Sequence, residues 1–181
     1  MSKHENFKKG SLTFDLSHLD PISVDFIRPA TEKNTEKKYK VWVSFSDHCF
    51  TDHFAKNDDI DWLYKPSYTE RYFCTDRYQH SKGLMGVLHN LALTNPYIGK
   101  TFNQHREQYY HLEANILDID YSVFFEIDKN NNPANDLRIK IVSAYEKAEW
   151  SQAVSTSSHH KFWSVLDSKV NNTKLKMKRR R

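Results

Sequence analysis

Three segments of the chain show the alternation of apolar and polar residues that predicts half-buried β-strands. In residues 39–46 a Tyr, Val or Phe occupies every second position, with Lys, Trp or Ser between them. Residues 121–127 and 137–145 are rich in Phe, Tyr, Val and Ile, and the insert at 128–136 has the composition of a turn. This pair predicts an antiparallel hairpin with a long loop. Residues 69–75 predict a further short strand, and residues 11–28 predict extended segments.

Helical spacing marks two other segments. Leu84, Val87, Leu88 and Leu91 recur at helical spacing, Ser81 is a suitable N-cap, and Asn95-Pro96 ends the pattern, which predicts a helix over about 81–95. Residues 159–170 repeat this spacing and predict a last helix.

Together these elements predict an α+β fold. The expected architecture is a central antiparallel sheet of about four strands, with the helix at about 81–95 inserted before the hairpin and flanking helices. Only 38% of the 181 residues are hydrophobic, but aromatic residues reach 14% and can fill a core. Without an internal repeat or a linker-like stretch, residues 1–170 are expected to form one domain and residues 171–181 a basic disordered tail.

Several classes of protein are disfavoured by what the sequence does not contain. No apolar run reaches the roughly 20 residues of a membrane-spanning helix, and the first residues lack the apolar stretch of a signal peptide. A cytoplasmic protein with no membrane partner is therefore expected. None of the four glycines belongs to a phosphate-binding or dinucleotide-binding loop, so no cofactor is expected.

The nearest approach to a metal-binding motif involves His48, Cys49, His53 and Cys74. These residue types suit zinc, but adjacent residues of a strand point to opposite faces and no paired C-x-x-C motif exists. No metal site is predicted, and the cysteines are read as free thiols, with the thiol at the strand end buried.

Arg77, His80 and Ser81 stand between the short strand and the helix at about 81–95. Backbone amides at a helix start bind phosphate, and a neighbouring Arg can clamp it in bidentate fashion. The simpler alternative is an N-cap beside a surface Arg.

The second hairpin strand ends in two hydroxyl side chains. Strict alternation places Ser143 and Tyr145 on the apolar face of that strand, and Arg138 and Lys140 on the other face. A hydroxyl on the core side needs a hydrogen-bonding partner or an opening onto a cleft. Arg138 and Lys140 are expected on a solvated face.

The formal net charge is +4, and six of the last eight residues are basic. Such a run is a solvated arm or an arm that contacts nucleic acid. The residues concerned are Lys174, Lys176, Lys178, Arg179, Arg180 and Arg181.

Taken together, Arg77 and Ser81, the helix that ends at Asn95-Pro96, the YSVFFEID strand and the LRIKIVSAY strand resemble a known superfamily. This is the barnase, EndoU, colicin and RelE-like group of small metal-independent ribonucleases, in its phage-borne and toxin branches. The resemblance covers roughly residues 39–145. It implies a four-stranded antiparallel sheet with basic and hydroxyl residues on its concave side, and cleavage of RNA through the ribose 2′-OH.

Metal-free cleavage needs a base, an acid and cations beside the developing phosphorane charge. The resemblance implies His48 as base or acid, Arg77 as phosphate clamp, and Ser143 and Tyr145 as positioning groups or proton donors. The expected function is an RNA-cleaving toxin or nuclease-like effector of a mobile element, with RNA as substrate and an antitoxin protein as a neutralising partner. The alternative is a non-catalytic module that binds nucleic acid or protein with the same sheet and tail. The oligomeric state is left open.

Overall fold

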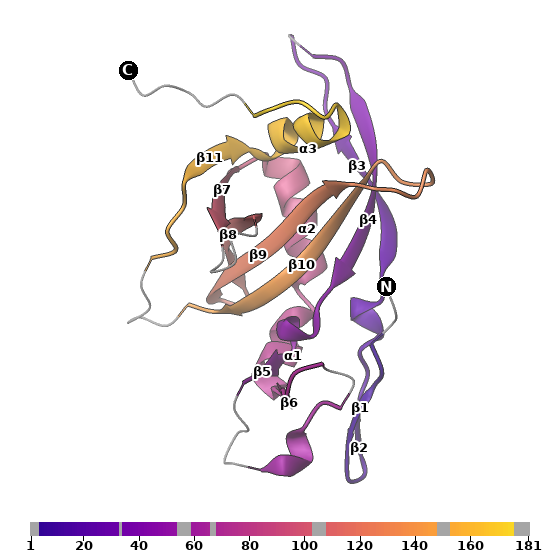
Figure 1. The fold of residues 1–181 in the computed structure, drawn as a ribbon, viewed down its shortest axis with the longest axis vertical. Coiled ribbons are helices and arrows are strands. Elements are labelled where there is room, and N and C mark those ends of the chain that lie inside the picture. Colours follow the sequence, from indigo (N-terminus) through magenta and orange to yellow (C-terminus); the bar gives the residue numbers. More distant parts are fainter. Residues whose placement is uncertain are drawn as a thin grey trace.

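The computed structural model of the chain describes residues 4–32, 34–53, 59–65, 68–102, 108–147 and 153–175. Among them a seven-stranded sheet has the spatial order β11-β7-β8-β9-β10-β4-β3 (Figure 1). Neighbouring strands are antiparallel except β4 and β10, which run parallel, so the sheet is mixed. The strands are β3 (Ile22–Arg28), β4 (Lys37–Phe45), β7 (Tyr97–Phe102), β8 (Gln108–Ile116), β9 (Ile119–Lys129), β10 (Leu137–Glu146) and β11 (Ser158–Lys161).

The expectation of a four-stranded antiparallel sheet is therefore wrong. The predicted hairpin exists as β9 and β10, and the predicted strand at 39–46 exists as β4. The sheet is larger because β7, β8 and β11 extend it beyond β9, while β3 pairs with the outer edge of β4. Its parallel pair joins strands far apart in the sequence, with Val41 opposite Leu137 and Val43 opposite Ile139.

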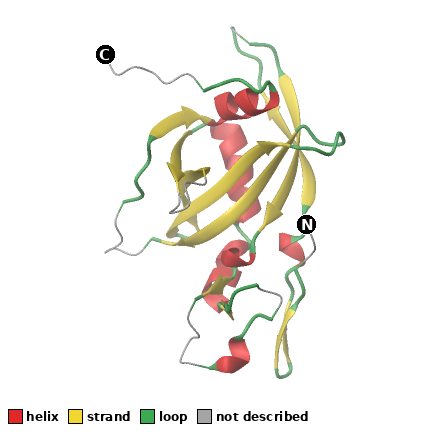
Figure 2. Cartoon of the chain, viewed as in Figure 1, coloured by secondary structure: helices red, strands yellow, loops and turns green. Residues whose placement is uncertain are grey.

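Two helices pack against the sheet and against each other. α2 (Leu84–Thr94) contacts β3 and β8, and α3 (Phe162–Val170) contacts β9, β10 and β11. Figure 2 shows α2 passing behind β9 and β10, with α3 close to its end. α2 buries Leu84, Val87, Leu88 and Leu91, as the helical spacing predicts. It ends at Asn95, whose left-handed backbone (φ 47°) closes the helix before Pro96.

The start of the predicted helix is wrong. Ser81 is the last residue of a separate helix, α1 (Thr75–Ser81), and α2 begins after Gly83. The predicted strand at 69–75 contributes only β6 (Tyr72–Phe73) before α1 begins. The predicted last helix is α3, which is shorter because the first residues of that segment form β11.

A smaller, aromatic part of the structure lies beyond one end of the sheet (Figure 1). Its core contains Phe7, Phe14, Trp62 and Phe73, and the rings of Phe7 and Phe73 stack with centroids 4.4 Å apart. These side chains join the residues under the sheet in one hydrophobic cluster. The elements here are β1 (Phe7–Lys9), β2 (Leu12–Phe14), η1 (Ser17–Leu19), η2 (Asp47–Cys49), β5 (Thr51–Asp52), η4 (Ile60–Trp62), β6 and α1.

Within the described residues, no helix combines the length and the apolar character needed to cross a membrane.

Candidate functional site

A β-bulge in β10 determines which side chains the strand presents on each face. The pairing of β10 with β9 shifts by one residue between Ile141 and Ser143. The shift reverses the alternation, since an extra residue on one strand moves all later side chains to the other face. Ile141 and Ala144 are buried against the helices, whereas Ser143 and Tyr145 are only half-buried.

The expectation that Ser143 and Tyr145 share the face of Leu137, Ile139 and Ile141 is therefore wrong. They lie on the face of Arg138 and Lys140, opposite the helices. In the described part of the chain no helix packs on this surface of β8, β9 and β10, and we call it the helix-free face. Arg138 there pairs with Asp128 at 3.3 Å.

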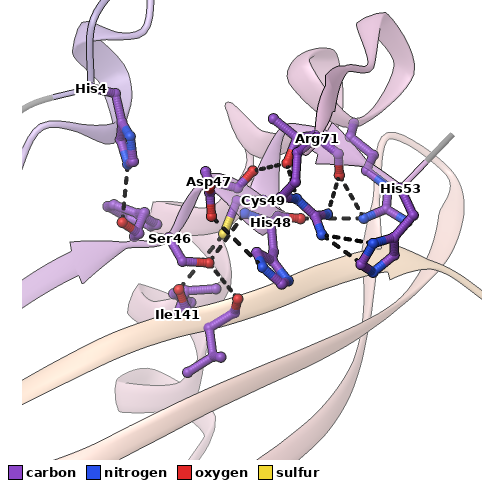
Figure 3. A network of polar contacts seen from close by, with 12 residues as sticks. His4, Ser46, Asp47, His48, Cys49, His53, Arg71 and Ile141 are labelled. Atoms are coloured by element: carbon purple, nitrogen blue, oxygen red, sulfur yellow. Dashed lines mark hydrogen bonds and ion pairs between the residues drawn. The ribbon is translucent and has the colours of Figure 1, made fainter. Parts of the chain in front are cut away.

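The bulge also holds the turn that carries His48. The Ser46 amide donates to the carbonyl of Ile141 at 2.9 Å, and the Ser46 hydroxyl donates to the carbonyl of Val142 (Figure 3). The Ser46 hydroxyl oxygen also accepts from the His48 amide at 3.3 Å, which caps the 3-10 helix η2. Strand β4 therefore ends at Phe45, and His48 lies on a 3-10 turn instead of on a continued strand.

Two arginines hold the segment that follows. The buried Arg71 donates from Nε to the Thr51 hydroxyl at 2.6 Å and from Nη2 to the Thr51 carbonyl at 3.0 Å. Arg77 donates from Nη1 to the carbonyls of Thr51 at 2.9 Å and His48 at 3.3 Å, and pairs with Asp52 at 3.1 Å. Arg77 therefore lies beside His48, but its guanidinium is already occupied with backbone and carboxylate partners.

His48 faces a second histidine that was not predicted as a partner in catalysis. The rings of His48 and His53 have centroids 6.2 Å apart, and Arg71 Nη1 lies 3.3 Å from His53 Nε2 (Figure 3). Burial and the Arg71 charge lower the pKa of His48, and Asp47, at 3.8 Å, opposes this. His48 is therefore mostly neutral near neutral pH and able to accept a proton.

The charges around these histidines are balanced. Asp47 and Asp52 both act on Arg71 and offset its positive charge, and Asp52 pairs with Arg77. No group of three or more His, Cys, Asp or Glu side chains in the described part of the chain is arranged to hold a metal ion. Cys49 and Cys74 are free thiols, as expected, and Cys49 is buried.

The helix-free face carries a row of aromatic rings across three neighbouring strands. His111 of β8 contacts Phe124 of β9 with ring centroids 4.9 Å apart, and Phe124 stacks on Tyr145 of β10 at 5.6 Å and an interplanar angle of 23°. His111 is buried, whereas Phe124 and Tyr145 are half-buried. Burial raises the pKa of Tyr145, and the nearby charge of Arg77 opposes that change, so the row ends within the electrostatic reach of Arg77.

The structure uses His80 and Ser81 internally. His80 is buried and its Nδ1 lies 2.8 Å from the Tyr121 hydroxyl. The buried Ser81 hydroxyl donates to the carbonyl of Tyr78 at 2.7 Å and contacts His18 Nε2 at 2.7 Å. Neither residue offers the exposed helix start that the phosphate-binding prediction needs, since Ser81 ends a helix.

The basic tail is described only at its beginning. Lys174 is exposed and lines a cavity beside the end of α3. Lys176, Lys178, Arg179, Arg180 and Arg181 lie outside the described residues.

Sequence reasoning missed Arg71, His111 and Phe124. Phe124 and Tyr145 come together because of the bulge, for which the sequence gives no signal. The strand of His111 had a usable signal, since apolar residues occupy every second position from Tyr110 to Ile116.

The fold and the site define an α/β protein with a mixed seven-stranded sheet, an aromatic helix-free face and a histidine pair beside a β-bulge. The model of the YjaZ family matches residues 6–170, and the chain belongs to this family. Searches among curated proteins and among solved structures find no match.

Proposed function

We propose that the protein binds single-stranded RNA on the helix-free face of its sheet, with the basic tail adding affinity. The observation that supports this most directly is the stacked pair of half-buried rings, Phe124 and Tyr145, on two adjacent strands. The buried ring of His111 packs against Phe124 from the next strand. Sheet-borne aromatic rings on which bases stack are a common means of binding single-stranded nucleic acid, and stacking contributes about 1–3 kcal/mol per base. This proposal corresponds to the non-catalytic binding module that the sequence indicates as the alternative to a ribonuclease. We also propose that the protein acts in the cytoplasm.

The charge arrangement also supports binding over cleavage. The two arginines nearest His48 are offset by Asp47 and Asp52, so the histidine pair has little excess positive charge to stabilise a phosphorane. A base stacked on Tyr145 would instead lie within reach of the Arg77 field, while the tail supplies further cations to the RNA backbone.

The test is fluorescence anisotropy with a labelled single-stranded RNA of about 12 nucleotides, a length within the range that such platforms cover. Phe124→Leu and Tyr145→Leu are each expected to weaken binding about 5-fold to 100-fold through loss of stacking. Tyr68→Leu is the matched control, because Tyr68 is a fully exposed aromatic residue in the segment between η4 and β6 and not on β8, β9 or β10. Equal affinity of all three variants and the wild type would exclude the helix-free face as the RNA site.

A second candidate function, RNA cleavage as implied by the ribonuclease resemblance, is favoured by the His48–His53 pair. A neutral, half-exposed imidazole beside a second imidazole is a suitable arrangement for a base and an acid. If cleavage occurs, His48→Ala should lower its rate about 100-fold to 10,000-fold, as loss of a general acid or base does. His89→Ala, which changes an exposed histidine on α2, is the control. If the protein binds RNA but leaves it intact, the cleavage function is excluded. An antitoxin protein is expected as a partner only if the protein cleaves RNA.

A further inference from the structure

A cavity of about 640 Å³ lies between the end of α3 and the strands β7, β8, β9 and β11. Its size falls within the range of small-molecule sites. Charged side chains from three parts of the chain, β7, the end of β9 and the end of α3, line it: Lys100, Lys129, Lys169, Lys174 and Asp128.

The strand pairing explains how the floor of this cavity forms. Lys100 of β7 lies opposite Tyr110 of β8 on one side and opposite Ser158 of β11 on the other. Tyr110 is buried and therefore belongs to the helix-facing side of the sheet, and Lys100 shares that side. This part of the floor is thus on the opposite face from the aromatic row, whereas Asp128, which also lines the cavity, lies opposite Arg138 in the strand register. None of the three rings of the aromatic row lines the cavity, so the two sites can be tested separately.

The lining carries a surplus of positive charge. Among the described residues of the lining, Asp128 is the one that is acidic, and it pairs with Lys169 at 3.2 Å and with Arg138 outside the cavity. Among the described residues, Lys129 and Lys174 take part in no ion pair, and both are exposed. Two cations of the lining are therefore available to an anion that enters.

At the C-terminal end of α3, beside the cavity, backbone hydrogen bonds occupy carbonyl groups that would otherwise repel an anion. The C-terminal carbonyls of a helix would repel negative charge if they faced the ligand. Here the Thr173 amide donates to the Ser168 carbonyl at 2.9 Å, and the Asn171 amide donates to the Asp167 carbonyl at 3.0 Å. Asn172 makes this reversal possible with a left-handed backbone (φ 51°), so these two carbonyls are bonded within the turn.

We propose that this cavity binds a small molecule carrying two or more phosphate charges. Lysine ammonium groups bind phosphate as point charges, and four of them surround one space here. The Gln108 and Ser158 side chains supply polar groups for orientation, and Gln108 Nε2 donates to the Tyr110 hydroxyl at 3.1 Å. A neutral ligand of this size would leave the lysine charges uncompensated.

The experiment is isothermal titration calorimetry of the full chain with inorganic pyrophosphate at low ionic strength. The double variant Lys129→Gln, Lys174→Gln is expected to bind at least tenfold more weakly, because a hydrogen bond to a charged group is worth about 1.5–3 kcal/mol and the variant removes two such donors. Lys147→Gln is the matched control, since Lys147 is a lysine paired with Glu113 at 2.8 Å away from the cavity. Unchanged pyrophosphate binding by the double variant, or no binding by the wild type, would overturn the proposal.

A second arm separates a small phosphate ligand from RNA phosphates. Tyr145→Leu should leave pyrophosphate binding unchanged while it weakens RNA binding, so that the two sites fail or succeed independently. If the wild type ignores pyrophosphate and the double variant loses affinity only for RNA, the cavity serves the nucleic-acid backbone and the small-molecule assignment is wrong.

Discussion

Asp167 joins α3 to the edge of the sheet, and its removal is a quantitative test of the structure. Its carboxylate accepts hydrogen bonds from the Tyr39 hydroxyl and the Lys37 ammonium, both at 2.7 Å, and it pairs with Arg28. Tyr39 is 1% exposed, so its hydroxyl depends on Asp167 as its hydrogen-bonding partner. Asp167→Ala therefore leaves a buried donor unsatisfied.

The expected loss follows from the exposure of each partner. An unsatisfied buried hydroxyl costs about 1–3 kcal/mol, and each of the two partly exposed ion pairs adds about 0.2–1 kcal/mol. Asp167→Ala should thus lower the free energy of unfolding by about 1.4–5 kcal/mol, measured by urea denaturation at neutral pH. Asp25→Ala is the matched control, because Asp25 pairs with Lys38 on the neighbouring strands at 2.6 Å but both side chains are exposed. Its cost should stay below about 1 kcal/mol.

The pH dependence gives this prediction a second readout. Burial alone would raise the pKa of Asp167, but the hydrogen bonds from Lys37 and Tyr39 outweigh it and the pKa is lowered from 3.8. A carboxylate with a lowered folded pKa contributes its full stability above its unfolded pKa and loses it as the pH falls through the folded value. The difference between wild type and Asp167→Ala should be constant from neutral pH down to about 5 and shrink below 3.8. A variant no less stable than Asp25→Ala, or a difference that does not shrink at all in acid, would refute the reasoning.

Three further predictions concern the tail, the thiols and the bulge. Deleting residues 176–181 should reduce the slope of log RNA affinity against log salt by about 0.7 for each phosphate that the tail no longer neutralises. The melting temperature should not fall. An unchanged slope would mean that the tail is a solvated arm that does not contact RNA. Burial raises the pKa of the Cys49 thiol to about 12, so in the folded protein a thiol reagent should modify Cys74 and leave Cys49 unmodified until denaturant is added; rapid modification of Cys49 would contradict its burial. Deleting Val142 should destabilise the protein far more than Val142→Ala, which keeps the bulge and its carbonyl, and equal urea midpoints would show that the bulge is dispensable.

Local patterns in the sequence identified the elements with strong periodicity. The hairpin of β9 and β10 and the strand β4 were predicted because apolar residues alternate there without interruption. The end of α2 was predicted because Asn95 and Pro96 stop a helix for separate reasons, one by adopting a left-handed backbone and the other by lacking an amide hydrogen.

The missed strands lacked the signals that mark a hairpin. β8 and β9 are joined by Leu117 and Asp118, which both have positive φ angles (53° and 63°). Two-residue turns of this kind usually carry Asn-Gly or Asp-Gly, and Leu-Asp gives no such indication. The parallel pairing of β4 with β10 joins segments nearly a hundred residues apart in the sequence, and no local pattern encodes it.

One part of the candidate site could be predicted from local sequence patterns, and another part could not. His48 and Arg77 could be proposed as site residues because each stands next to a predicted element, and in the structure Arg77 donates a hydrogen bond to the His48 carbonyl. The orientation of Tyr145 could not be predicted, because a single extra residue in β10 reverses its direction and no residue in the strand marks the position.

The bulge links the fold to both halves of this site. The carbonyl of Val142 accepts a hydrogen bond from the Ser46 hydroxyl that caps the turn of His48. The reversed alternation after the bulge places Tyr145 on the same face as Phe124. An uninterrupted strand would direct Tyr145 into the core beside the helices and leave Ser46 without this acceptor. Because β10 pairs regularly with β9 on both sides of the extra residue Val142, the bulge places the His48 imidazole and the aromatic rings at the same end of the sheet. This coupling means that a change at Val142 should alter the His48 turn and the helix-free face together, whereas substitutions at Phe124 alter only the face.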